Sequence, residues 1–220
     1  MTERSPEMPS LSLRQERKSR RDLIVKHAAA SFYERGFDRT TVRDIADRVG
    51  ITSGSIFYHF ESKEELLAWV IREGLKLGHE TAERALLGQN TAIGQYQALI
   101  RGHLEALHRH GYAHKVSVRE WDRLTDAARR ELKQINNRYR ERWLLILGAL
   151  RDEGILRSDP ETTRRMLIAS LNWTLHYRDV DLTDLGDLAL MIGASGLNMS
   201  VPQLSVSLNP PDGADPAVLW

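Results

Sequence analysis

Four histidines lie close together in the middle of the chain, and histidine is the residue type best suited to bind metal or exchange protons near neutral pH. They are His103, His108, His110 and His114. Gly111 is expected to interrupt a helix between His110 and His114, and no neighbouring carboxylate or cysteine completes a tetrahedral ligand set. The sequence therefore predicts neither a metal site nor a cofactor.

Catalytic groups are also missing elsewhere in the sequence. There is no glycine-rich phosphate loop and no nucleophile with an adjacent base. The chain has no cysteine, which excludes thiolate nucleophiles, disulfide frameworks and Cys-ligated zinc together. We therefore expect a protein that is not an enzyme.

A segment suited to nucleic-acid recognition lies nearer the start, at residues 51–60 (ITSGSIFYHF). Thr52 is the expected N-cap of a helix, because its hydroxyl can accept from the free amides of the next turn. Small polar side chains at this end allow a helix backbone to approach a groove closely, while Ile56 and Phe60 can anchor the opposite side. The small residues are Thr52, Ser53, Gly54 and Ser55.

The flanking residues predict the helices that would hold this segment. Apolar residues at Ile24, Ala28 and Phe32 recur at helical spacing up to Gly36, which indicates a helix from about Arg17. A second, short helix starts at Thr40 or Thr41 and closes at Gly50. Ser62 and Glu65 form a capping box that opens a long helix. Two short helices joined by a tight turn and braced by a third are typical of a helix-turn-helix unit.

The charge distribution agrees with this interpretation. The whole chain has a net charge of +1, but residues 11–63 hold 11 lysines and arginines against 7 aspartates and glutamates. A basic front segment is either a phosphate-binding footprint or a solvated surface. In the same way, Arg14, Arg17, Lys18, Arg20 and Arg21 form either an arm that reaches DNA or a solvated helix start.

The remainder of the chain also reads as helices, which gives an all-α fold. The clearest is Thr125 to Gly154, with an apolar stripe at spacings of three and four. Two further segments, after Pro160 and around Leu185, are apolar on more than one face and need two packing partners. The last residues hold four of the seven prolines and are expected to form a loose tail.

Residues 21–67 resemble the DNA-binding domain of the TetR family of bacterial regulators. The matching residues follow the order and spacing of the family's domain without gaps. The matching positions are Arg21, Ile24, Ala28, Phe32 and Gly36, then TVRDIA from Thr41 to Ala46, GITSGSIFYHF from Gly50 to Phe60, and SKEELL from Ser62 to Leu67. The resemblance implies an N-terminal three-helix DNA-binding domain at 16–63, a helical ligand-binding and dimerisation domain at 64–199, and flexible tails at 1–15 and 200–220.

The resemblance also implies which residues meet DNA. Ser53, Ser55 and Tyr58 would face base edges or phosphates in the major groove, although the two serines could instead serve only as caps. The positions expected to flank the groove or meet the DNA backbone are Thr41, Arg43, Thr52, His59 and Lys63. The chain departs from the family at Phe57, where a tyrosine is usual. Either Tyr58 replaces that phosphate contact, or binding loses a neutral hydrogen bond worth roughly 0.5–1.5 kcal/mol.

The ligand site is less clearly marked. Helical bundles bind ligands between helices, in mainly apolar pockets with a few polar anchors. Aromatic residues are candidates for the walls, or else for an ordinary core: His103, Trp121, Trp143, Trp173, His176 and Tyr177. The family suggests a small, largely apolar effector such as a fatty acyl group or its coenzyme A ester, which would need Arg119, Arg123 or Arg178 near the pocket mouth.

A homodimer is expected, because a two-fold dimer matches a palindromic operator. The predicted interface is the pairing of the last two long helices through Leu167, Leu171, Leu175, Leu185, Leu188 and Ile192.

The expected partners are thus double-stranded operator DNA, a small-molecule effector and a second copy of the chain. No membrane partner is expected, since no apolar run approaches a membrane span and the N-terminus lacks a signal-like segment. A cytoplasmic repressor is the favoured interpretation, with repression over activation resting on the family alone. The alternatives are a DNA-binding protein without sequence preference and, less favoured, an enzyme with a DNA-binding head.

Overall fold

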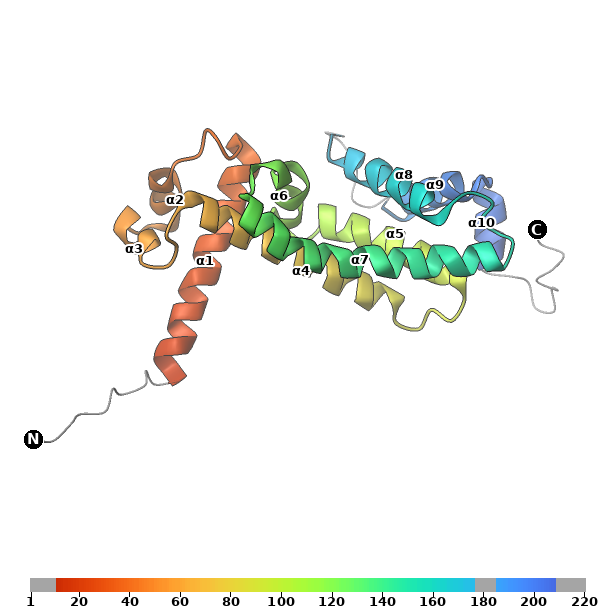
Figure 1. Cartoon of the computed structure of the whole chain (residues 1–220), viewed down its shortest axis with the longest axis horizontal. Coiled ribbons are helices and arrows are strands. Elements are labelled where there is room, and N and C mark those ends of the chain that lie inside the picture. Colours follow the sequence, from red (N-terminus) through yellow and green to blue (C-terminus); the bar gives the residue numbers. More distant parts are fainter. Residues whose placement is uncertain (1–10, 177–184, 209–220) are drawn as a thin grey trace, which may run out of the picture.

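The computed structural model describes residues 11–176 and 185–208, and every regular element in these ranges is a helix. The prediction of an all-α fold is therefore confirmed. A small head of three helices lies at one end, and a bundle of longer helices extends from it (Figure 1). None of the helices in these ranges is long and apolar enough to cross a membrane.

The head consists of α1 (Leu11–Arg35), α2 (Val42–Val49) and α3 (Ser53–Phe57). Thr41 begins α2 with a capping box: its hydroxyl accepts from the Asp44 amide at 3.1 Å, and the Asp44 carboxylate accepts from the Thr41 amide at 2.8 Å. Gly50 ends α2 with a left-handed φ of 78°, which glycine adopts at no steric cost. The chain then turns directly into α3, as the sequence predicted.

Buried apolar side chains hold the head together. Ile24, Ile45, Ile56 and Phe60 are each at most 1% exposed and belong to one cluster. That cluster also takes in Val116, Leu124 and Leu132, which come from the body of the protein. The head therefore packs directly against the body.

The body contains the remaining helices, and a second apolar cluster fills its interior. α4 runs through both parts: Leu66 and Leu67 near its start pack in the head, and Ala82 near its end packs in the body. The body elements are α4 (Lys63–Leu86), α5 (Ala92–His108), α6 (Ala113–Arg119), α7 (Asp126–Asp152), α8 (Pro160–Trp173), α9 (Leu185–Leu197), α10 (Val201–Leu208) and two 3₁₀ turns at Trp121–Arg123 and Thr174–His176. The domain boundary predicted at 63–64 falls at the start of a helix that both parts share.

Two glycines let α4 and α6 lie unusually close. A Cβ atom added to Gly74 would stand 2.3 Å from the carbonyl oxygen of Ala113. One added to Gly78 would stand 2.7 Å from Cε1 of His114. This close approach places α6 against α4, between the head and the rest of the bundle.

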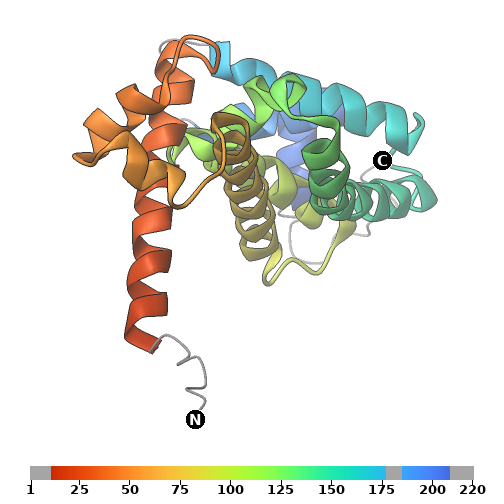
Figure 2. The same cartoon turned by 60° about the vertical axis from the view of Figure 1, so that its left-hand side comes forward.

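The ends of the chain differ from expectation. α1 begins at Leu11 instead of near Arg17, and its N-terminal half extends away from the bundle (Figure 2). Residues 201–208, predicted to belong to a loose tail, form α10. The reason is that Leu204 is fully buried in the body core, while Gln203 accepts from the Ser200 amide at 2.8 Å and caps the helix start. The rest of both predicted tails, residues 1–10 and 209–220, lies outside the described residues.

Candidate functional site

α3 and the turn after it present polar groups on the outside of the head. Ile56 and Phe60 are buried and fix this segment to the core, as predicted. Tyr58 is 66% exposed and Phe57 is 53% exposed, so both are free to meet a partner molecule. Thr52 is also exposed, and Ser53 and Ser55 are half-buried. The predicted recognition segment is therefore accessible.

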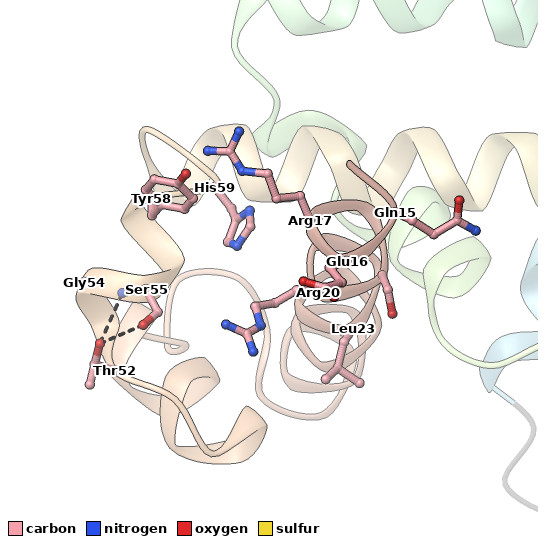
Figure 3. A pocket seen from close by; sticks show the side chains of 11 residues that line it. Gln15, Glu16, Arg17, Arg20, Leu23, Thr52, Gly54, Ser55, Tyr58 and His59 are labelled. Carbon is pink, nitrogen blue, oxygen red and sulfur yellow. Dashed lines mark hydrogen bonds between the residues drawn. The ribbon is translucent and has the colours of Figure 1, made fainter. Parts of the chain in front are cut away.

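Two of the predicted DNA-contacting residues are also helix N-caps, Thr52 for α3 and Thr41 for α2. Oγ1 of Thr52 accepts from the backbone amide of Ser55 at 3.2 Å and lies 3.0 Å from the hydroxyl of Ser55 (Figure 3). Thr41 has the corresponding role at α2, where it shares a hydrogen-bond pair with Asp44. Capping therefore fixes the orientation of these hydroxyls while Thr41 and Thr52 remain exposed.

Lys63 has an internal role that the sequence did not predict. Its ammonium donates to the carbonyl oxygens of Phe37 and Thr40, each at 3.0 Å, and lies 4.2 Å from the centre of the Phe37 ring. These contacts join the start of α4 to the loop between α1 and α2. Lys63 thus has partners within the head, unlike Arg43, whose side chain is exposed on α2.

An open groove separates α1 from α3, and two arginines of α1 face it. Arg17 and Arg20 point across the groove towards Tyr58, His59 and Ser55 (Figure 3). The guanidinium carbon of Arg17 lies 4.8 Å from the centre of the Tyr58 ring. Partial burial lowers the pKa of His59, and nearby arginines lower it further. Arg17 and Arg20 outnumber the one carboxylate of this groove, Glu16, so the surface beside the recognition segment has a net positive charge.

Arg21 differs from its neighbours. Its guanidinium lies 3.7 Å from the centre of the Trp69 ring and 3.7 Å from a carboxylate oxygen of Glu65, both on α4. It therefore joins α1 to α4. The side chain of Arg14 lies outside the described residues.

The body contains a cavity of about 420 Å³ that could hold a small molecule. Of the predicted wall residues, His103 and Trp121 line it. The other predicted wall residues lie elsewhere: Trp143 is fully buried in the body core, and Trp173 and His176 stack at 4.6 Å, exposed, at the end of α8 and in the turn that follows it. Tyr177 lies outside the described residues. The cavity walls are Leu75, Gly78, His79, His103, His114, Ser117, Val118, Trp121, Asp122, Ile135, Asn136, Asn137, Tyr139, Arg140, Arg164, Ile168 and Asn172.

A hydrogen-bonded chain of polar side chains forms part of this wall. Nδ1 of His103 lies 2.9 Å from the Tyr139 hydroxyl, and Nε2 of His103 lies 3.1 Å from Oδ1 of Asn172. Burial, followed by the neighbouring His114, lowers the pKa of His103 to about 3. Burial also raises the pKa of Tyr139. His103 is therefore neutral and Tyr139 protonated near pH 7.

Arginines other than the predicted ones line the cavity. Arg140 and Arg164 both contact Glu161, at 3.3 and 2.8 Å, and the hydrogen bond from Arg164 is the main reason that the Glu161 pKa falls to about 2. The predicted Arg119 instead faces the Tyr33 ring at 4.5 Å, and Arg123 pairs with Asp38 at 2.6 Å. Arg178 lies outside the described residues.

The four central histidines do not converge on one point. Nε2 of His108 lies 2.8 Å from the Thr174 hydroxyl, and Nε2 of His110 lies 3.0 Å from a carboxylate oxygen of Glu105. His103 and His114 lie in the cavity wall. Within residues 11–176 and 185–208, no group of three or more metal-ligating side chains is arranged to hold an ion.

Four leucines of the predicted dimer interface are buried in their own protomer, and the outer face of α8 and α9 carries other apolar residues. Leu167, Leu171, Leu175 and Leu185 are at most 8% exposed inside their own protomer, so they cannot pair with a second copy. The opposite stripe is exposed, because both helices use one apolar face for the core. Half-buried Leu188 and Ile192 and exposed Met166, Trp173 and Met191 line a groove of about 750 Å³ there. The sequence had indicated this stripe, because the segments after Pro160 and around Leu185 are apolar on more than one face.

A three-helix head with a capped recognition segment, joined to a helical body with an internal cavity, defines a helix-turn-helix regulator with a ligand-binding domain. The family model for bacterial regulatory proteins of the tetR family matches residues 24–70, and the model for the tetracycline repressor-like C-terminal domain matches residues 89–178.

Known proteins agree with these matches. The chain is 34% identical over 143 residues to the HTH-type transcriptional repressor KstR2 of Mycolicibacterium smegmatis, covering 64% of this chain and 69% of that protein. The solved structure of the ketosteroid transcriptional regulator KstR2 of Mycobacterium tuberculosis is 29% identical, with a TM-score of 0.70 over 81% of this chain and 93% of that one. A structure described as the superantigen PfiT is 35% identical, with a TM-score of 0.69 over 81% of this chain and 96% of that one. The chain belongs to the TetR family of transcriptional regulators.

Proposed function

We propose that this protein is a repressor that binds a palindromic operator as a homodimer and leaves it when a small molecule occupies the body cavity. One observation carries the proposal: α6 contributes to both sites. His114 and Ser117 of α6 line the cavity, and Glu120 at its end accepts a hydrogen bond from the Phe37 amide of the head. A ligand that shifts α6 therefore acts directly on the head.

The proposed DNA contacts centre on α3. Ser53, Ser55 and Tyr58 meet the major groove, with Thr41, Arg43, Thr52 and His59 at its edges. Exposure of Tyr58 and the nearby positive charge of Arg17 and Arg20 support this assignment. Lys63 is proposed to contribute by holding the loop before α2 and not through a phosphate contact, since its ammonium has two carbonyl partners there.

The proposed dimer forms through the exposed face of α8 and α9. Exposed large apolar side chains on a soluble domain mark an interaction surface when they lie together. Met166, Trp173 and Met191 are each more than 60% exposed and line one groove. A second copy of the chain covers this face, so that two heads meet two half-sites.

The effector class expected from the family is a fatty acyl or acyl-coenzyme A molecule. Leu75, Ile135 and Ile168 give the cavity an apolar part that suits such a chain. Histidine, tyrosine and asparagine side chains on the same wall add polar anchors. Arg140 and Arg164 line the cavity as well and place two guanidinium groups where an anionic group of the effector can meet them.

Selection of bound DNA from a random duplex pool, followed by sequencing, tests the proposal. A dimeric regulator enriches a palindrome with half-site centres about one helical turn, roughly 34–36 Å, apart. A Tyr58→Ala variant should enrich it poorly, whereas Leu145→Ala, an exposed apolar residue of α7, should not differ from the unaltered protein. No enriched motif would favour DNA binding without sequence preference.

A further inference from the structure

The body cavity contains a buried hydrogen-bond acceptor without a partner among the described residues: Nε2 of His114. The residue is 6% exposed. Its other ring nitrogen, Nδ1, lies 2.9 Å from the carbonyl oxygen of Gly74. A carbonyl oxygen only accepts, so Nδ1 carries the proton and Nε2 presents a lone pair.

The ring of His114 is neutral in the folded protein. Burial lowers its pKa to about 4, and the hydrogen bond to Gly74 opposes this only in part. A neutral imidazole with Nδ1 protonated has no proton left to offer at Nε2. This nitrogen can only be satisfied by a donor.

The neighbouring groups do not supply that donor. The His103 ring lies 5.4 Å from the His114 ring, and both of its nitrogens have partners. Oδ1 of Asn172 accepts, so Nε2 of His103 donates to it and Nδ1 accepts the proton of the Tyr139 hydroxyl. The oxygen of Tyr139 is then left with acceptor capacity only. Of the three residues His103, His114 and Tyr139, the two that still have capacity, His114 and Tyr139, are therefore both acceptors.

We propose that the effector is a molecule with a hydroxyl or N–H group that donates to Nε2 of His114 inside the cavity. The inference rests on the proposed role of the cavity as the effector site. An unpaired buried acceptor is costly, so a donor gains more here than it would in water. A carboxylate or an ester oxygen at this point would face a lone pair and is disfavoured. The volume of about 420 Å³ lies within the range of small-molecule pockets.

Two probes that differ in whether their oxygen carries a hydrogen or a methyl group test this chemistry. 2-Naphthol carries a donor hydroxyl, and 2-methoxynaphthalene has the same rings and oxygen without the donor. Isothermal titration of the full-length protein should give an affinity for 2-naphthol about tenfold or more above that for 2-methoxynaphthalene. Equal affinities, or no binding of 2-naphthol at millimolar concentration, would overturn the proposal.

A variant assigns the preference to His114. His114→Phe keeps an aromatic ring but removes the acceptor, so the preference for 2-naphthol should disappear. His110→Gln, which alters a histidine that contacts Glu105 outside the cavity, should retain it. A preference that persists in His114→Phe would contradict the assignment. If that variant does not fold, the ¹⁵N resonance of His114 Nε2 can be followed in the unaltered protein. It should shift on addition of 2-naphthol, and an unchanged resonance would contradict the proposal.

Operator binding separates this inference from the proposed function. A protein that binds its selected operator but does not distinguish the two probes remains a regulator, and the donor proposal fails alone. A protein that prefers 2-naphthol but selects no operator retains the site, and the proposed function fails alone.

Discussion

The carboxylate of Glu120 accepts a hydrogen bond from the backbone amide of Phe37 at 3.2 Å, across 83 residues of sequence. Glu120 follows the last residue of α6, and Phe37 lies in the loop between α1 and α2. The contact therefore connects the helix that lines the cavity to the segment that orients the helix-turn-helix. A movement of α6 would therefore be transmitted to the head through this hydrogen bond.

Replacing Glu120 tests the strength of this connection. Glu120→Ala removes the acceptor and should lower the free energy of unfolding by about 0.5–1.5 kcal/mol, the usual net value of one hydrogen bond. Glu120→Gln keeps a carbonyl acceptor and should lose less. Urea denaturation followed by circular dichroism measures both; equal losses in the two variants would show that the hydrogen bond is not what stabilises this contact.

The close approach of α4 and α6 predicts opposite effects for two similar substitutions. Gly→Ala within a helix normally stabilises by about 1 kcal/mol, and Gly148→Ala in α7 should do so, since nothing lies within 4 Å of the added Cβ. Gly74→Ala instead places its Cβ 2.3 Å from the backbone of Ala113 and should destabilise by about 1–3 kcal/mol. Thermal unfolding of both variants checks this. A stable Gly74→Ala protein would mean that α6 moves aside at little cost.

The two buried histidines predict a loss of stability in acid. Burial lowers the pKa of His103 to about 3 and that of His114 to about 4 from an ordinary value of 6.5. The unfolded chain therefore binds more protons as the pH falls below 6.5, and this continues down to each folded-state pKa. Between pH 7.5 and pH 5, each histidine should reduce the free energy of unfolding by about 2 kcal/mol.

Urea denaturation at the two pH values measures this fall. His114→Phe should make this fall smaller by about 2 kcal/mol, while His110→Gln should leave it unchanged. A fall that is the same in His114→Phe as in the unaltered protein would contradict the buried, neutral state of His114.

The arginines of α1 predict part of the salt dependence of DNA binding. Each arginine that contacts a phosphate adds about 0.9 to the slope of log affinity against log salt. Replacing both Arg17 and Arg20 by alanine removes four arginines from a dimer and should lower this slope by about 4, because both side chains face the groove beside α3 (Figure 3). Fluorescence anisotropy with operator DNA at several salt concentrations gives the slope, with Arg151→Ala in α7 as the control. An unaltered slope would leave the solvated helix start as the better interpretation.

The exposed stripe of α8 and α9 predicts the dimer contact. Met191→Asp places a charge where two apolar surfaces meet and should convert a dimer into a monomer at micromolar concentration in sedimentation velocity. Leu145→Asp alters an equally exposed apolar residue on α7 and should remain dimeric. A dimeric Met191→Asp variant would place the interface elsewhere, and a monomeric unaltered protein would contradict the proposed dimer.

The helices of the head were largely predictable, because the positions where they begin and end depend on local sequence signals. Thr41 and Gly50 at the two ends of α2, Thr52 before α3 and Ser62 before α4 are capping residues whose effect reaches only a few positions. The sequence could not show that Lys63 turns inward, because its carbonyl partners lie more than 20 residues away.

The body was predictable only as a set of helices. The periodicity of Leu167 and Leu171 shows that one face is apolar, but not whether that face meets the core or a second protomer. The same limit applies to Trp143 and Trp173, which have the same side chain and opposite environments: one is fully buried and the other 61% exposed. The histidine wall of the cavity depends on contacts among α4, α5, α6, α7 and α8, which no local pattern specifies.

The specificity of DNA binding tests the central claim most directly. Competition of a labelled, selected operator against random duplex DNA, at one salt concentration, gives the ratio of specific to non-specific affinity. A repressor of the kind proposed should prefer its operator by roughly 10³ or more. A ratio near one would contradict the account and leave a protein that binds DNA only through its basic head.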